Sequence, residues 1–575
     1  MARRISFHHS VSVERQVPIP MRDGVCLTAD IYRPKHLPES QLLPVLLMRL
    51  PYGRAIASTV TYAHPSWYAN QGYIVVIQDV RGCGTSDGEF YPFRAEYEDG
   101  YDTVGWCAEK LPGSSGKVGM YGFSYQGVTQ FQAAVMQPPG LVTICPAMAT
   151  ADLYHGWFYF GGAMCLDFNL TWGLQLTQNR AQVLKQEPTA TNIFRAQQEI
   201  SKWLQHTPLT AMPPLKDEPL GQFFFDWVNH RAPDAPYWQE LNPLSRFENY
   251  DLPALHIAGW ADLFIEATIN TYDAACRATS QPQHLIAGPW QHMPWVQQVG
   301  ELDFGPGASS QIDRLQVAWF DYWLKGIDQG VMAALEEGET ELPRRSVQLF
   351  LMGENCWINH AAPTDNALPR ALAGMESSEQ LTFYLAEDFH LELEPVAELE
   401  TLPDIYTYDP RIPTPSTSYG FYDQRGVQNR WDLLVYRSGI LTKPLAVVGI
   451  AECTLYAATT AVATDWVVKL LDIYPDGREI LISMGVLRTS ERDSIIPDQI
   501  HEYIIALRPT AQVFATGHRL GLTISSAAFP LIDRHSNTDL NPNTVNVSDF
   551  VEATQRIHHS GQYPSQLRLP LADVD

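Results

Sequence analysis

Short apolar runs separated by helix-compatible stretches dominate the first 148 residues. These runs are continuous rather than alternating, which is typical of parallel strands buried on both faces: residues 45–48, 73–77 and 118–121. Helical spacing over residues 66–71 and 97–107 separates them. Upstream, residues 17–32 hold two strand-like runs around an Asp-Gly pair, which predicts a β-hairpin. This order of elements predicts an α/β fold with a doubly wound sheet.

Residues 149–248 interrupt this order. They are rich in Trp, Phe, Tyr, Gln and Leu, with helical spacing over residues 192–204 and no clear strand pattern. The strand pattern resumes at residues 255–259 and 284–288. A helical insert between strands of one sheet is typical of a cap that shapes a pocket and excludes water. We therefore expect an α/β domain made of residues 1–148 and 249–338, with residues 149–248 as its cap domain.

Beyond residue 338 the pattern changes to short alternating runs between Gly, Pro and Asp turns. The clearest runs are residues 347–353, 466–473, 502–507 and 520–525. Long helical patterns are absent from this part of the sequence. Many short strands with such turns predict a β-sandwich. We expect residues 339–575 to form a jelly-roll β domain.

A glycine-flanked serine stands where one predicted strand gives way to a helix. The segment reads Gly-Phe-Ser-Tyr-Gln-Gly over residues 122–127, with Ser124 between the apolar run and the helical run. A serine at such a turn is exposed at the carboxyl end of the sheet, above a helix amino terminus. The pattern predicts a nucleophile elbow if a base and an acid follow; otherwise it is only a strand-to-helix turn.

Two later strand ends supply the missing groups. Serine needs a histidine that takes its proton and an acid that orients the imidazole. Asp262 follows the strand at residues 255–258, and His292 follows the strand at residues 285–287, each after a glycine. The order Ser, Asp, His is the one expected in an α/β fold of this kind. We predict Ser124, Asp262 and His292 as a catalytic triad.

Other residues compete for these roles. His256 and His284 lie within the strands and are predicted to be packed core histidines. Glu266 could replace Asp262 but is expected inside the following helix. Asp262 itself could be a helix N-cap, and His292 an ordinary loop residue.

An oxyanion hole requires two donors. One is the backbone N–H of Tyr125, the residue after the nucleophile. The other should come from the loop Arg-Leu-Pro-Tyr-Gly-Arg at residues 49–54, which has no HGGG-type motif. The phenolic O–H of Tyr52 could serve there, or Tyr52 could be an ordinary half-buried tyrosine.

Composition narrows the possible partners. The chain has 575 residues, 45% hydrophobic residues and a net charge of −25, as expected for a globular chain of several domains. Such an acidic surface disfavours nucleic-acid and membrane partners. No apolar run reaches the roughly 18 residues of a membrane helix, and no secretory signal is expected at the start. The eight cysteines are scattered, which favours free thiols in the cytoplasm and predicts no metal site.

Taken together, these motifs resemble the cocaine esterase and X-Pro dipeptidyl-peptidase family of serine hydrolases. The resemblance covers the full chain in collinear order and is carried by residues 49–53, 78–82, 122–127, 259–262, 288–292, 320–326, 464–466, 474–478 and 517–520. It implies an α/β-hydrolase domain, a helical cap and a carboxy-terminal jelly roll. It also implies Ser124, Asp262 and His292 as triad, with the Tyr52 O–H and the Tyr125 N–H as oxyanion hole.

Three branches of this family differ in substrate. X-Pro dipeptidyl-peptidases carry a large domain before the hydrolase, which this sequence is not expected to have. α-Amino ester hydrolases read an ammonium with carboxylates placed partly after the triad acid, whereas here Asp262 is followed by Leu, Phe and Ile. The cocaine esterase branch uses an aromatic acyl pocket. This sequence has Trp157, Trp172 and Phe264 at positions that resemble those of its pocket residues. The two tryptophans could instead only pack the cap against the sheet.

The expected function is hydrolysis of carboxylic esters with bulky or aromatic acyl groups through an acyl-enzyme, without a cofactor. The alternatives are an amidase, a dipeptidyl-peptidase-like activity or acyl transfer to an amine on the same triad, and a non-catalytic binding protein. The expected partner is a small-molecule ester or amide, and a homo-oligomer is compatible with the sequence.

Overall fold

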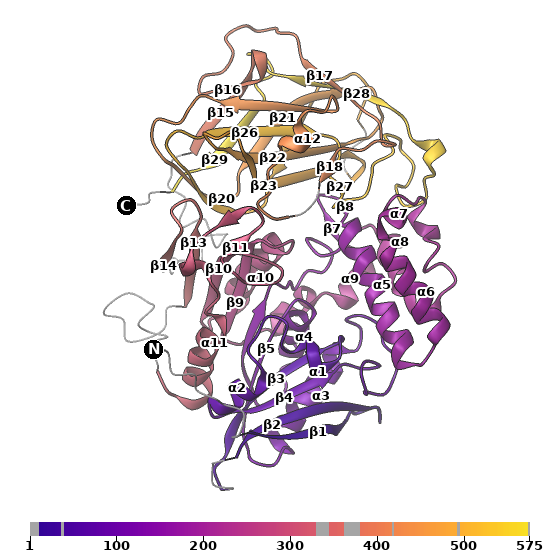
Figure 1. Ribbon diagram of the computed structural model, residues 1–575, viewed down its shortest axis with the longest axis vertical. Coiled ribbons are helices and arrows are strands. Elements are labelled where there is room, and N and C mark those ends of the chain that lie inside the picture. Colours follow the sequence, from indigo (N-terminus) through magenta and orange to yellow (C-terminus); the bar gives the residue numbers. More distant parts are fainter. Residues whose placement is uncertain are drawn as a thin grey trace.

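The computed structural model describes residues 11–35, 40–328, 344–361, 380–416, 419–491 and 495–572. It has three parts (Figure 1). An α/β domain lies at the bottom of the view, a cluster of magenta helices lies to its right, and a β domain in orange and yellow lies on top. No helix in the described part of the chain is long and apolar enough to cross a membrane.

A ten-stranded sheet forms the centre of the α/β domain, in the order β1-β2-β4-β3-β5-β6-β9-β10-β13-β14. Neighbours from β4 to β13 run parallel, while β1, β2 and β14 add antiparallel edges. The strands are β1 (Val11–Pro20), β2 (Cys26–Pro34), β3 (Leu43–Leu50), β4 (Ile74–Asp79), β5 (Ser114–Phe123), β6 (Leu141–Ala147), β9 (Ala254–Ala261), β10 (Gln283–Gln291), β13 (Arg345–Leu351) and β14 (Cys356–Ala361).

Helices cover both faces of this sheet. They are α1 (Arg54–Ala57), α2 (Pro65–Asn70), α3 (Glu96–Glu109), α4 (Tyr125–Ala134), α10 (Ile265–Ala278) and α11 (Ile312–Phe320), followed by a π-helical turn, Asp321–Lys325. Val45 and Leu47 of β3 pack in one core with α3 and α4, whereas Leu46 and Met48 pack in another with α2 and α11. Because both faces are buried, the strand reads as a continuous apolar run. The predicted α/β-hydrolase sheet is confirmed.

The cap is inserted between β6 and β9. Its helices are α5 (Leu166–Val183), α6 (Glu187–Gln198), α7 (Ile200–Leu204), α8 (Gln222–Asn229) and α9 (Pro236–Leu241). The predicted helix over residues 192–204 is broken at Glu199, between α6 and α7. The cap also contains a small hairpin, β7 (Tyr159–Phe160) with β8 (Ala163–Met164), whose two-residue strands are too short to produce a sequence pattern.

The β domain is built on an eleven-stranded, mainly antiparallel sheet in the order β17-β28-β21-β29-β15-β16-β19-β26-β22-β23, with β24 paired to β21. Its strands are β15 (Gln380–Ala386), β16 (His390–Glu392), β17 (Asp404–Tyr408), β19 (Leu433–Ser438), β21 (Glu452–Thr459), β22 (Asp465–Ile473), β23 (Glu479–Arg488), β24 (His501–Ala506), β26 (Arg519–Ser525), β28 (Ala553–His558) and β29 (Gln566–Pro570). The predicted jelly roll is confirmed.

Smaller elements complete the description. They are β11 (Gln298–Val299) with β12 (Leu302–Asp303), β18 (Pro415–Ser416) with β27 (Phe529–Pro530), β20 (Leu445–Gly449) with β25 (Thr510–Phe514), α12 (Arg425–Gln428), and the 3₁₀ turns Leu209–Ala211, Pro219–Gly221, Pro243–Asn249, Pro306–Ala308, Glu387–Phe389, Thr489–Glu491 and Val547–Asp549.

One predicted strand belongs to a different domain than expected. The sequence pattern places the run at residues 347–353 in the jelly roll, but β13 pairs in parallel with β10 of the α/β sheet, with Arg345 opposite Gln283. An alternating apolar run predicts a strand but does not say which sheet it joins. The predicted boundary between residues 338 and 339 lies outside the described residues.

A buried arginine joins the β domain to the cap. Arg488 at the end of β23 is fully buried between two carboxylates, with its Nη2 2.7 Å from Asp465 Oδ2 and its Nη1 2.8 Å from Asp533 Oδ2. Its backbone N–H donates to the Gly161 carbonyl (2.8 Å), and Asp533 Oδ1 accepts from the Met164 N–H (2.7 Å). The hairpin that precedes α5 is therefore fixed to the β domain.

Arg488→Met should lower the free energy of unfolding by about 3–5 kcal/mol, because two buried carboxylates lose their cation. Thermal unfolding measures the change. The control is Arg478→Met, which removes a solvent-exposed ion pair with Asp476 and should cost about 0–1 kcal/mol. Equal shifts in the two variants would contradict this account of the joint.

Candidate active site

Ser124 lies at a sharp junction between a strand and a helix. β5 ends at Phe123 and α4 begins at Tyr125, so that Ser124 alone makes the turn, with φ 61° and ψ −128°. A positive φ is costly for a residue with a side chain and recurs at functional sites. The turn is held by hydrogen bonds from the Ser124 N–H to the Ala147 carbonyl (2.9 Å) and from the Gly127 N–H to the Ser124 carbonyl (2.8 Å).

The two flanking glycines are required by contacts. A Cβ at Gly122, where φ is 140°, would lie 2.5 Å from Cβ of Gln126, and a Cβ at Gly127 would lie 2.4 Å from Cβ of Ala149. Such distances cannot be reached without displacing the backbone. The Gly-x-Ser-x-x-Gly pattern therefore reflects the close approach of α4 to the end of β5 and to the residues just after β6.

Asp262 and His292 are brought together from two adjacent strands. β9 and β10 pair in parallel, with Ala258 opposite Ala287, and each chain turns at its carboxyl end. His292 Nδ1 lies 3.0 Å from Asp262 Oδ1. The Asp262 side chain is fully buried, whereas 18% of the His292 side chain is exposed. A carboxylate that accepts the Nδ1 proton leaves Nε2 as the basic nitrogen.

The rival residues lie elsewhere. His256 is buried in β9, where its Nε2 meets Gln283 Oε1 at 3.0 Å, and burial lowers the pKa of its imidazole to about 4. His284 is buried as well, in contact with the ring of Trp319. Glu266 lies within α10. These residues are placed in the core or in a helix, as the sequence predicts.

Tryptophans fix the loops that carry the triad candidates. A Cβ at Gly259 would lie 2.3 Å from the Trp290 carbonyl oxygen, so only glycine lets the two strands approach here. Trp290 Nε1 donates to the Ala308 carbonyl (2.7 Å), and Trp295 Nε1 donates to the His292 carbonyl (3.1 Å). The His292 loop is thus held on both sides.

Tyr52 points toward the serine from the loop after β3. Its hydroxyl oxygen accepts a hydrogen bond from Trp172 Nε1 (3.1 Å), which leaves its own O–H free to donate. Burial raises the pKa of Tyr52 above its usual range, while polar contacts with Trp172 and Ser124 act in the opposite direction. The phenol therefore stays protonated, and thus a donor, at every pH of interest.

The side chain of Tyr125 packs in the core behind the cavity. Its backbone N–H is the group predicted to belong to the oxyanion hole. Tyr125 stacks on Phe93 with ring centroids 4.4 Å apart, and its hydroxyl donates to Glu96 Oε1 (2.9 Å). Glu96 in turn pairs with Arg49 Nη1 (2.9 Å), and all these side chains are buried. The sequence pattern did not single out Glu96, since an acid in the first turn of a helix is common.

A cavity of about 840 Å³ opens above Ser124. Ser124, His292 and Tyr52 all line it, and Trp172 and Asp167 face them from α5. Among the described residues the further lining is Ile56, Ala57, Val60, Phe123, Gln126, Phe168, Thr171, Gln175, Ile200, Leu263, Met293, Tyr419 and Leu531. The walls are thus mainly apolar, with Tyr419 and Leu531 contributed by the β domain.

The three predicted pocket residues do not all reach this cavity. Trp172 belongs to its lining, while Trp157 and Phe264 are absent from the lining within the described part of the chain. Those two stack on each other with centroids 4.3 Å apart, and Trp157 meets the edge of Trp172 at 5.5 Å. They form a second layer that supports the wall, which corresponds to the packing alternative for Trp157.

Possible metal ligands and the cysteines are the other groups to consider in the sequence. In the ranges that the structure describes, no group of three or more His, Cys, Asp or Glu side chains could hold a metal ion. All eight cysteines are free thiols. Cys83 is buried near the loop after β4, and burial raises the pKa of its thiol well above the usual range.

A serine, an imidazole and a buried carboxylate at the carboxyl edge of an α/β sheet are the arrangement of an α/β-hydrolase of the serine hydrolase class. Comparisons with known proteins agree. The family model of the X-Pro dipeptidyl-peptidase (S15 family) matches residues 23–294, and that of the X-Pro dipeptidyl-peptidase C-terminal non-catalytic domain matches residues 361–568.

Individual relatives match along the whole chain. Cocaine esterase from Rhodococcus sp. (strain MB1 Bresler) is 32% identical over 598 aligned positions. The match covers 97% of this chain and 98% of that protein. A putative serine esterase of Mycobacterium bovis is 25% identical, and the match covers 88% of this chain and 89% of that protein. The solved structure of an α-amino acid ester hydrolase has a TM-score of 0.79 at 25% identity, over 98% of this chain and 97% of the other. The chain belongs to the cocaine esterase and X-Pro dipeptidyl-peptidase (S15) family of serine hydrolases.

Proposed function

We propose that this protein hydrolyses carboxylic esters with bulky or aromatic acyl groups, with Ser124 as nucleophile, His292 as base and Asp262 as the orienting acid. The observation that carries the proposal is the shared cavity, which Ser124 and His292 line while Asp262 holds His292 at 3.0 Å. The mainly apolar walls around Trp172 suit a flat or branched acyl group. The curated relatives named as esterases point the same way.

The mechanism follows from this geometry. His292 Nε2 takes the Ser124 proton while the oxygen attacks the ester carbonyl, and Asp262 stabilises the imidazolium. The developing oxyanion accepts hydrogen bonds from the Tyr52 O–H and the Tyr125 N–H. The alcohol leaves with a proton from His292, and water then repeats the sequence on the acyl-enzyme.

The supporting parts have proposed roles as well. Residues 149–248 act as the cap that closes the cavity, and the jelly roll, which we take to begin after β14, supplies Tyr419 and Leu531. Trp157 and Phe264 set the position of Trp172 from behind. The free thiols fit a cytoplasmic protein, and a small-molecule ester or amide is the expected partner.

Ser124→Ala should lower kcat for an aryl ester by about 10⁶, the scale seen when a triad serine is lost. Steady-state hydrolysis of p-nitrophenyl esters with acetyl, butyryl and benzoyl groups measures it. A Ser548→Ala variant controls for serine content, since that serine is exposed in the β domain and its hydroxyl lies near Asp549 (3.5 Å), away from the cavity. Wild-type rates in Ser124→Ala would refute the assignment.

A second candidate function is hydrolysis of α-amino acid esters or amides. Asp167, in the first turn of α5, is the one carboxylate among the described cavity-lining residues, and no Lys or Arg lines the cavity there. Burial raises the pKa of Asp167, and a hydrogen bond with Thr171 opposes the shift. The solved structure named as an α-amino acid ester hydrolase gives this candidate its substrate class.

Asp167→Asn separates the two candidates. On the second, kcat/KM for phenylglycine methyl ester should fall about tenfold relative to phenylacetic acid methyl ester, because an ammonium loses its charged partner. In the wild-type protein, the preference for phenylglycine methyl ester over phenylacetic acid methyl ester should fade as the pH falls through the raised pKa of Asp167, because the carboxylate becomes protonated. The control is Glu187→Gln on α6. An unchanged ratio of the two esters would leave simple ester hydrolysis as the function.

A further inference from the structure

One segment of the cavity wall has no strand pairing of its own. Residues 52–60, here called the Tyr52 segment, connect β3 to α2 and contribute Tyr52, Ile56, Ala57 and Val60 to the cavity. The segment contains only the four-residue helix α1, whose N-cap residue is Gly53 and so has no side chain that could cap the helix. Trp172 Nε1 contacts the Tyr52 hydroxyl (3.1 Å), but the backbone of the segment needs an anchor of its own.

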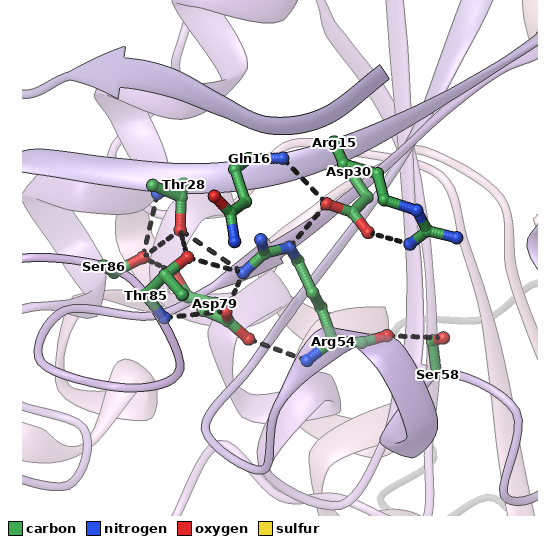
Figure 2. A network of polar contacts seen from close by, with 9 residues as sticks. All are labelled: Arg15, Gln16, Thr28, Asp30, Arg54, Ser58, Asp79, Thr85 and Ser86. Atoms are coloured by element: carbon green, nitrogen blue, oxygen red, sulfur yellow. Dashed lines mark hydrogen bonds and ion pairs between the residues drawn. The ribbon is translucent and has the colours of Figure 1, made fainter. Parts of the chain in front are cut away.

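A buried arginine of the segment itself, Arg54, provides that anchor (Figure 2). Arg54 is the first residue of α1, and its backbone N–H donates to Asp79 Oδ1 (2.7 Å). Its guanidinium donates to Asp79 through Nη1 and to Asp30 Oδ1 through Nε (2.8 Å). Asp79 ends β4 and Asp30 lies in β2, so Arg54 ties the segment to two neighbouring strands of the sheet.

The anchor is enclosed and its groups are matched. The side chains of Arg54, Asp30 and Asp79 are 8%, 4% and 1% exposed. Arg54 Nη1 also donates to the hydroxyls of Thr85 (3.1 Å) and Thr28 (3.3 Å), as Figure 2 shows. Hydrogen bonds of this kind are strong in a buried setting and cannot be replaced by water.

The two carboxylates are fixed by further contacts of their own. Burial by itself would raise the pKa of Asp30, but hydrogen bonds from Arg54 and the Gln16 N–H outweigh it and hold that pKa below its usual value. A Cβ at Gly84 would lie 1.9 Å from Asp79 Oδ2, so only glycine leaves room for the second carboxylate. Neither acid has freedom to follow a displaced Arg54.

We infer that Arg54 is a positioning residue for the oxyanion hole, which acts on the reaction only by holding Tyr52. Arg54 does not belong to the described lining of the cavity, so it does not touch substrate. Only Gly53 separates it from Tyr52, and Ser58 Oγ donates back to the Arg54 carbonyl (3.0 Å), so that the segment is tied to the position of Arg54. A misplacement of about 1 Å at a catalytic group can cost about 10²-fold in rate. The inference rests on the proposed function.

The test compares Arg54→Gln with a matched arginine. Arg81 also pairs with two carboxylates of the same domain, Asp99 (2.6 Å) and Asp23 (2.8 Å), and both of these partners lie outside the Tyr52 segment. Arg54→Gln should lower kcat for an aryl ester about 30-fold with a smaller change in KM, while Arg81→Gln stays within about threefold of wild type. Equal losses in the two variants would overturn the inference.

A double-mutant cycle with Tyr52→Phe identifies the route of the effect. Tyr52→Phe alone should lower kcat by about 10²–10³, as for one oxyanion donor. In that background Arg54→Gln should change kcat by less than about threefold, because its target is already gone. Full additivity of the two losses would show that Arg54 acts in some other way.

Two safeguards keep the outcome clear. If Arg54→Gln does not fold, as judged by thermal unfolding, Arg54→Lys and Asp79→Asn each weaken the same anchor and enter the same cycle. Failure of the proposed function appears in the wild-type protein, which would then not turn over aryl esters. The rate at which a fluorophosphonate modifies Ser124 gives the same comparison of Arg54 and Arg81 variants without turnover, since that reaction also uses the Tyr52 hydroxyl.

Discussion

The buried hydrogen bond between Asp262 and His292 is the constraint on which the rest of the catalytic edge depends. A fully buried carboxylate needs a hydrogen-bonding or charged partner. For Asp262 that partner is the imidazole of His292. The parallel pairing of β9 with β10 brings the two groups together, and the glycine at position 259 allows the close approach of Trp290. The elbow at Ser124 then only has to face a histidine that is already in place.

The other two domains enclose the cavity at this edge of the sheet and so restrict the access of water to it. The cap contributes α5 with Trp172, and the β domain contributes Tyr419, so that all three domains line one cavity. Arg488 fixes the hairpin before α5 to the β domain, while Arg54 fixes the Tyr52 segment to the sheet from below. Buried arginines between paired carboxylates thus hold two walls of the cavity, which is what a preorganised oxyanion site requires.

Much of this could be predicted from sequence because it depends on local patterns. Ser124, Asp262 and His292 stand directly after apolar strands, and parallel strands bring their carboxyl ends to one edge. Tyr52 came from the family resemblance, and its role stays a prediction. Arg54 and Tyr419 gave no signal, since their contacts join residues far apart in the chain: Arg54 with Asp30, and Tyr419 with the cap. The sequence pattern places residues 347–353 in the wrong sheet, because an alternating run predicts a strand but not the strands with which it pairs.

The central claim, that Ser124 is activated at this edge, is tested most directly by chemical modification. The protein is incubated with a fluorophosphonate, its intact mass is measured, and the modified peptide is sequenced. The account predicts one adduct per chain, on Ser124, which forms much more slowly when His292 is replaced by Gln. No adduct, or an adduct on a different residue, would contradict it.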